Sequence, residues 1–96
     1  MAILRVTDEA VACLKEEWAF GDGEIVRIYA RYAGGDEPYA LGIWKESQVP
    51  DGNGNLMQTN AGGITFFIEE KDQWFLQGQD LTIDAEHDNI RFIVGT

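Results

Sequence analysis

The residues of this chain that could take part in catalysis or bind a metal are few. Cys13, Ser47 and His87 are each the only residue of their type among the 96. Zinc sites usually need three or four Cys and His ligands, so one cysteine and one histidine do not form such a site within one chain. A serine hydrolase would have to pair Ser47 with His87, and neither lies in the sequence setting of an activated nucleophile. We therefore predict neither zinc nor serine-hydrolase chemistry.

Carboxylates are abundant, and adjacent pairs occur at residues 36–37 and 69–70. Two carboxylates can divide the roles of general acid and general base when burial raises the pKa of one of them. Adjacent residues of a strand point to opposite faces, however, so these pairs are predicted to be solvated surface groups. We therefore expect a protein that is not an enzyme.

The overall charge excludes several classes of partner. Seventeen acidic and seven basic residues give a formal net charge of -10, which repels nucleic acids and anionic membranes. No apolar segment approaches the roughly 20 residues needed to span a bilayer, and residues 1–6 lack the basic and apolar regions of a signal peptide. A single cysteine leaves no internal disulfide, in agreement with a reducing compartment. We expect one cytoplasmic domain over residues 1–96.

One amphipathic helix is predicted near the start of the chain. Thr7 is followed by two acidic residues, a pattern typical of a helix N-terminus. Val11, Leu14 and Trp18 then recur at helical spacing and are predicted to face the core. The two glycines within residues 21–23 are expected to end the helix.

Most other segments are predicted to be strands. Residues 24–32 alternate between apolar and polar side chains, and residues 39–44 resume the alternation after a turn, so the two segments are expected to pair as an antiparallel hairpin. Residues 45–63 are polar and glycine-rich, and a long connection with a short strand near residues 56–59 is expected. Further strands are expected at residues 3–6, 64–68, 81–84 and 90–94, with a helical segment at 69–76 in which Trp74 and Phe75 turn back onto the sheet.

The outward face of the first hairpin is the most unusual surface that the pattern predicts. Basic and aromatic side chains gather there in a strongly acidic chain, as in contact surfaces for a protein or an anionic small molecule. In the structural alternative the arginines pair with nearby acids and the tyrosines pack on a second sheet. The predicted contact surface comprises Arg27, Tyr29, Arg31, Gly34, Gly35, Asp36, Tyr39 and Trp44.

The order of the elements resembles the HesB-like family, also called IscA-like or A-type iron–sulfur carriers. The resemblance spans nearly the whole chain, and it implies a β-rich α+β fold of six or seven mostly antiparallel strands in a sandwich-like core with two helices. The segments that carry it are Ile3-x-x-Val6-Thr7-Asp8-x-Ala10, Val26-Arg27-Ile28 with Arg31-x-x-Gly34, Gly63-Ile64-x-Phe66-Phe67-Ile68, and Trp74-x-x-x-Gly78-x-x-Leu81-x-Ile83-Asp84.

The family's metal ligands are missing from the matching positions. In the family a cysteine follows the glycine that matches Gly34, and a Cys-Gly-Cys lies near the C-terminus. Here Gly35 stands at the first position, and the sequence ends at Thr96 without the second motif. Holding iron or an iron–sulfur cluster requires thiolate ligands, so the resemblance implies the fold and no bound cofactor or metal.

Three interpretations stay open. The first is a non-enzymatic HesB-like protein that binds a protein partner in or near iron–sulfur cluster assembly. The second is a small-ligand-binding or catalytic domain that reuses the pocket beside Gly35, with Asp36 or Asp84 as candidate carboxylates. The third is an iron or cluster carrier that uses Cys13 across an oligomer, although Cys13 lies beside the predicted buried helix face and is expected to be a small core side chain. Because family members often self-associate, the resemblance also leaves a homodimer open.

Overall fold

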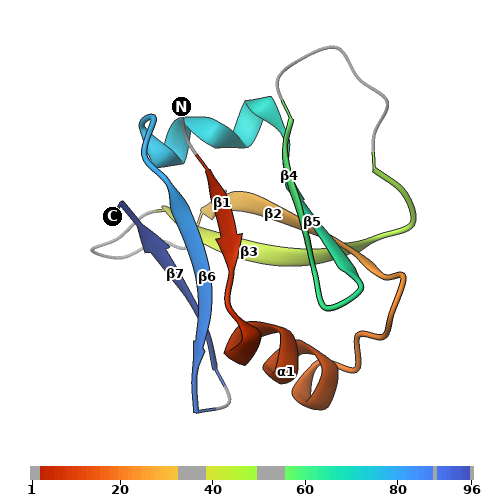
Figure 1. Cartoon of the computed structure of the whole chain (residues 1–96). Coiled ribbons are helices and arrows are strands. Elements are labelled where there is room, and N and C mark those ends of the chain that lie inside the picture. Colours follow the sequence, from red (N-terminus) through yellow and green to blue (C-terminus); the bar gives the residue numbers. More distant parts are fainter. Residues whose placement is uncertain (1–2, 33–38, 50–55, 88, 96) are drawn as a thin grey trace.

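Two mixed β-sheets and two helical segments make up the part of the chain that the computed structural model describes, residues 3–32, 39–49, 56–87 and 89–95 (Figure 1). One sheet has the strand order β1-β6-β7 and the other β3-β2-β5-β4. The predicted β-rich α+β fold is therefore confirmed. The elements are β1 (Leu4–Val6), α1 (Asp8–Glu17), β2 (Ile25–Tyr32), β3 (Tyr39–Glu46), β4 (Met57–Ala61), β5 (Ile64–Ile68), η1 (Glu70–Leu76), β6 (Leu81–Glu86) and β7 (Asn89–Val94).

Helix α1 begins where the sequence predicts. The Thr7 hydroxyl accepts a hydrogen bond from the backbone N–H of Ala10 at 3.2 Å, which satisfies one of the N–H groups left free in the first helical turn. The same hydroxyl donates to the Asp84 carboxylate at 2.7 Å. The cap therefore also fastens α1 to β6.

The end of α1 differs from the prediction. The helix ends before the glycines of residues 21–23, because Ala19 takes a left-handed conformation with a φ of 61° and the Phe20 N–H donates to the Leu14 carbonyl at 3.1 Å. The prediction that Trp18 faces the core is wrong, since its side chain is 48% exposed beyond the last helical turn. The buried residues of α1 are Ala10, Cys13 and Leu14.

Strand β2 is an inner strand of the four-stranded sheet. It pairs antiparallel with β3, which confirms the predicted hairpin, and parallel with β5. Strand β5 is buried on both faces, as expected for a continuous apolar segment. Ile64, Phe66 and Ile68 join the core cluster, while Phe67, 1% exposed, alternates with them.

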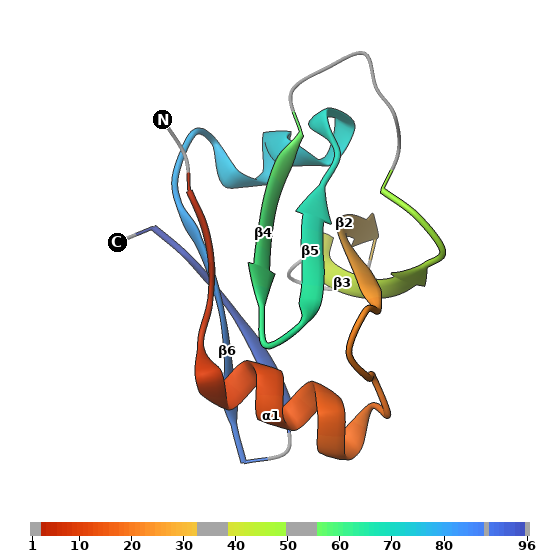
Figure 2. The same ribbon diagram turned by 45° about the vertical axis from the view of Figure 1, so that its right-hand side comes forward.

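The predicted short strand within residues 45–63 is β4, and it pairs antiparallel with β5. The two strands are joined by Gly62 and Gly63, whose φ angles of 58° and 84° are both left-handed, as a two-residue type I′ hairpin requires. A Cβ atom on Gly62 would collide with Val11 Cγ1. The turn therefore lies against α1, and both Figure 1 and Figure 2 show it beside that helix.

The three-stranded sheet joins distant parts of the chain. Strand β1 pairs parallel with β6, with Leu4 opposite Leu81 and Val6 opposite Ile83, and β6 pairs antiparallel with β7 as a hairpin. The side chains of Leu81 and Ile83 are fully buried. The predicted edge strand at residues 3–6 and the predicted strands at 81–84 and 90–94 are confirmed.

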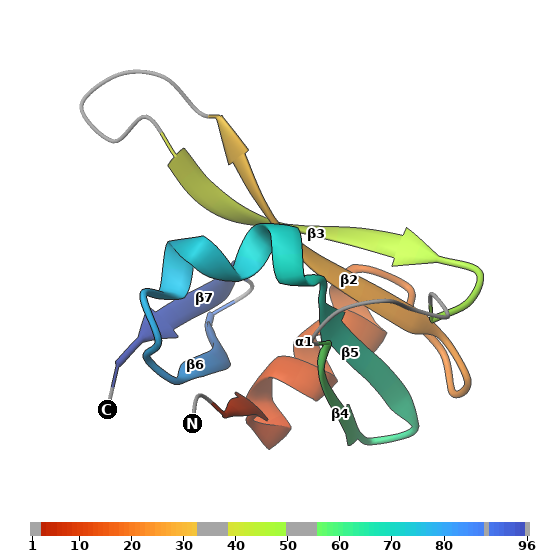
Figure 3. The ribbon, with the colours of Figure 1, turned by 90° about the horizontal axis from the view of Figure 1, so that it is seen from above.

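The second helical segment, η1, is a 3₁₀ helix that lies against β2 (Figure 3). Three residues per turn place Gln73 and Leu76 on the same side, where Gln73 Nε2 donates to the Ile68 carbonyl at 3.1 Å and Leu76 is buried. Trp74 was predicted to turn back onto the sheet; it is instead 54% exposed, with its ring edge-to-face on Phe75. Neither α1 nor η1 has the length and apolar character needed to cross a bilayer.

Candidate functional site on the β2–β3 hairpin

The described part of the predicted contact surface lies on one face of the β2–β3 hairpin. Arg27, Tyr29 and Arg31 alternate along β2 with core residues. Arg27 lies opposite Trp44 and Tyr29 lies opposite Gly42, and directly opposed residues of antiparallel strands share a face. Trp44 is 58% exposed. The structure therefore places these side chains together, while their role in binding stays a prediction.

The remaining members of the predicted surface cannot be placed in the same way. Gly34, Gly35 and Asp36 lie outside the described residues. Tyr39 is the first residue of β3 and lies opposite Tyr32, but the side chains of both tyrosines are also outside the description. A contact role for these residues stays a prediction from the sequence.

Arg27 belongs to a cluster of charges between β2 and η1. Its Nε lies 3.2 Å from Glu69 Oε1 and its Nη2 lies 3.7 Å from Asp72 Oδ2. The guanidinium also lies 5.2 Å from the centre of the Tyr29 ring, a cation–π distance. Arg27 Nε and Asp72 Oδ2 make no hydrogen bond, so the attraction within the cluster is mainly Coulombic. For Arg27 these contacts agree with the structural alternative, in which the arginines pair with nearby acids.

The position of Asp72 follows from the end of a strand pairing. Strand β5 pairs with β2 only as far as Ile28, so the N–H of Ala30 needs a different acceptor. Asp72 Oδ1 accepts from that N–H at 3.4 Å, and the Asp72 residue is only 8% exposed. Asp72 therefore replaces the missing strand partner and also balances the charge of Arg27.

Gly42 is a residue of this site that the sequence interpretation missed. A Cβ atom at Gly42 would lie 2.9 Å from Tyr29 Cζ and 3.1 Å from Arg31 Cδ. The absence of a side chain thus lets the Tyr29 ring and the Arg31 chain lie across β3 at this point. The sequence signal was a lone glycine inside an alternating strand, which often marks a place where another group lies close to the backbone.

Arg31 differs from Arg27 in its surroundings. It is exposed, and within the described segments no ion pair to it is found, whereas Arg27 has two carboxylate neighbours. The two arginines, predicted as one surface, therefore have different surroundings within the described part of the chain.

Cys13 lies where the helix pattern predicted, on the buried face of α1 and 6% exposed. Iron–sulfur clusters are usually held by four thiolates. Gly35 supplies no thiolate at the family's first ligand position, and across the described ranges no three His, Cys, Asp or Glu side chains gather as a metal site would require. The residues present do not fit an iron–sulfur cluster.

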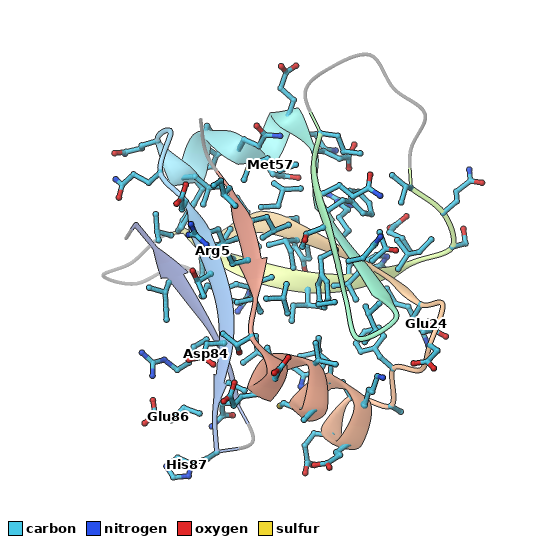
Figure 4. The ribbon with its side chains drawn as sticks, in the orientation of Figure 1. Arg5, Glu24, Met57, Asp84, Glu86 and His87 are labelled. Atoms are coloured by element: carbon cyan, nitrogen blue, oxygen red, sulfur yellow. The ribbon has the colours of Figure 1, made fainter. Side chains whose placement is uncertain are left out.

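Asp84, one of the two candidate carboxylates, takes part in a hydrogen bond that links two elements of the fold. It accepts the hydrogen bond from the Thr7 hydroxyl, and this bond, the Ala85 backbone N–H and the charge of Arg91 lower the pKa of Asp84. A carboxyl with a lowered pKa is ionised near neutral pH and is poorly suited to act as a general acid. Figure 4 shows Asp84 near the start of α1, with Glu86 and His87 farther out at the tip of the β6–β7 hairpin.

We expect the Thr7–Asp84 contact to make stability depend on acid pH. The pKa of Asp84 is lowered in the folded protein, so its contribution is fully present above the unfolded aspartate pKa of about 3.9 and is lost as the pH falls through the lower, folded value. Thermal unfolding of the wild type and Asp84→Asn between neutral pH and pH about 2.5 measures it. The difference in Tm should shrink toward the acid end; a constant difference would contradict the prediction.

The two-sheet architecture defines the class of protein. No family model matches the chain. Among solved structures, Escherichia coli SufA, described as involved in biosynthesis of iron–sulfur clusters, aligns with a TM-score of 0.62 and 20% identity over 96% of this chain and 80% of SufA. IscA with its [2Fe-2S] cluster aligns with a TM-score of 0.54 and 16% identity over 94% of this chain and 78% of that chain. The fold is that of the A-type iron–sulfur carriers.

A sequence relative then fixes the family. The chain is 32% identical to the pyruvate dehydrogenase inhibitor of Bacillus subtilis (strain 168) over 88 aligned residues, which cover 88% of each protein. The chain belongs to the HesB-like family, as a divergent member with one cysteine.

Proposed function

We propose that this protein is a non-enzymatic member of the HesB-like family that binds pyruvate dehydrogenase and lowers its activity. The observation that carries the proposal is the 32% identity to a protein named as a pyruvate dehydrogenase inhibitor, along 88% of both chains. A match of this extent covers most of the chain rather than one short motif.

The site chemistry supports a role in binding rather than in cluster transfer. The one cysteine is buried in α1, and Gly35 replaces the thiolate that the family resemblance implies. Exposed Trp44 and Arg31 on the β2–β3 hairpin are residue types enriched at protein interfaces. We infer that this hairpin face contacts the enzyme.

The second interpretation, a domain that reuses the pocket beside Gly35, has weaker support where it assumes catalysis. Gly35 and Asp36 lie outside the described residues, and Asp84 is engaged with Thr7. The third interpretation requires Cys13 to reach a cluster, and its 6% exposure disfavours this. A cytoplasmic location and self-association as a homodimer both stay predictions.

The proposal is tested with purified pyruvate dehydrogenase complex from the native cell. We expect its activity with pyruvate to fall in a saturable manner as this protein is added, and the two proteins to coelute on size exclusion. SufA is the matched control, because it shares the fold at 20% identity and is expected to leave the activity unchanged. Undiminished activity at saturating protein, or equal inhibition by SufA, would contradict the proposal. Elution of this protein alone also reports whether it forms a dimer.

A further inference from the structure

A cavity of about 480 Å³ opens between the edge strand β3 and the edge strand β7, which belong to different sheets. Three consecutive β3 residues line it, Leu41, Gly42 and Ile43. Because successive side chains of a strand point to opposite faces, a cavity that touches all three meets the strand at its edge. Ile90 and Phe92 line the β7 side, and their spacing of two places them on one face of that strand.

Two polar groups of the cavity come from β2, the neighbour of β3 in the hairpin. Tyr29 and Arg31 belong to β2, which is not an edge strand, yet both line the cavity. They reach it because Gly42 has no side chain, so that the Tyr29 ring and Arg31 Cδ lie across β3. Gly42 is therefore the residue that brings an aromatic hydroxyl and a guanidinium to the edge of β3.

The charge of the lining is opposite to that of the protein. The chain carries a net charge of -10, but among the described residues the cavity lining includes Arg31 and no carboxylate. Arg31 is exposed and forms no ion pair with any residue that the structure describes. A carboxylate or sulfonate is the group that guanidinium binds with charge-assisted hydrogen bonds.

Most of the other lining residues are apolar. Trp18, 48% exposed at the end of α1, joins Leu41, Ile43, Ile90 and Phe92 around the cavity. Binding sites for small organic molecules typically have volumes of about 300–1,000 Å³, apolar walls and a few polar groups that fix orientation. The cavity between β3 and β7 has a volume in this range and combines apolar side chains with polar groups.

We propose that this cavity binds a small organic monoanion, with its acidic group on Arg31 and an apolar body against Trp18, Ile43 and Phe92. The site shares Arg31 with the face proposed to contact pyruvate dehydrogenase, but the anion binding does not depend on that enzyme. Tyr29 and Asn89 supply the other polar groups of the lining.

The test uses two fluorescent probes with the same apolar body, anilinonaphthalene sulfonate and uncharged phenylnaphthylamine. We expect saturable binding of the sulfonate at one site per chain, more tightly than the uncharged probe. Arg31→Gln should weaken sulfonate binding about tenfold and remove the preference for the anion. Arg91→Gln is the matched control, because Arg91 lies on β7 between the two lining residues and pairs with Glu86 at 2.7 Å. That variant should bind as the wild type does.

A second variant tests the geometry. Gly42→Ala should displace Tyr29 and Arg31 and weaken sulfonate binding, while thermal unfolding of each variant reports whether the fold is retained. Ile43→Asp places a carboxylate in the lining and should also weaken binding. The proposal is overturned if neither probe binds saturably, if the uncharged probe binds equally well, or if Arg31→Gln and Arg91→Gln weaken binding to the same extent.

Discussion

Substitution of Gly62 by alanine is expected to destabilise the protein by about 2–5 kcal/mol. A left-handed conformation costs a residue with a Cβ atom about 1–2 kcal/mol, and Gly62 has a φ of 58°. The new Cβ would also collide with Val11 Cγ1, and overpacking costs a further amount of about 1–3 kcal/mol. Chemical denaturation monitored by circular dichroism measures the loss.

The variant pair Val11→Ala and Val11→Ala/Gly62→Ala separates the two costs. Removing the Val11 methyl groups relieves the collision. In the Val11→Ala protein, Gly62→Ala should therefore lower the free energy of unfolding only by the cost of the left-handed backbone conformation. Gly21→Ala is the matched control, because a Cβ atom there would have no neighbour within 4 Å and its φ is not left-handed. A loss from Gly62→Ala below about 1 kcal/mol would show that the turn does not need glycine at this position.

Arg27→Ala and Arg31→Ala are expected to differ although both side chains belong to β2. Arg27 is 24% exposed at its side chain and faces Glu69 and Asp72, so its removal leaves a mostly buried carboxylate without its cation and should cost about 1–3 kcal/mol. Arg31 is exposed, and its removal should change stability by no more than about 0.5 kcal/mol. Thermal and denaturant unfolding of the two variants measures the difference.

The control for the Arg27 prediction is a double variant that also removes the charge of Asp72. In an Asp72→Asn background, Arg27→Ala should cost less than in the wild type, because the carboxylate that needs the cation is gone. For binding to the partner enzyme we expect the opposite order of the two variants. Arg31→Ala should weaken binding clearly although it hardly changes stability. Equal stability losses for the two arginines would disprove the separation of their roles.

Much of the fold could be predicted because local pattern and packing agree. The alternation along residues 24–32, the apolar segment 64–68 and the Thr7 cap each predict an element that the structure contains. The errors lie where tertiary contacts decide. Trp18 continues the helical spacing of apolar residues in the sequence, but the left-handed conformation of Ala19 ends the helix, and the indole is exposed.

The candidate site was predictable only in part, for a geometric reason. Alternation identifies which side chains share a face of β2, but it contains no information on η1, whose Asp72 and the preceding Glu69 surround Arg27. It also cannot show that Gly42 lets two side chains cross to the edge of β3, nor that β7 lies across the cavity. These relations depend on the packing of segments that are distant in sequence.

The pairing of β1 with β6 affects how the protein folds during synthesis. Residues 4–6 have no partner strand in their sheet until residues 81–83 have been made, and the Thr7 hydroxyl that caps α1 also donates to Asp84. Long-range pairings of this kind form slowly compared with local ones. We expect the growing chain to leave residues 4–6 without their strand partner until β6 has emerged from the ribosome, so aggregation before completion is a hazard in its production.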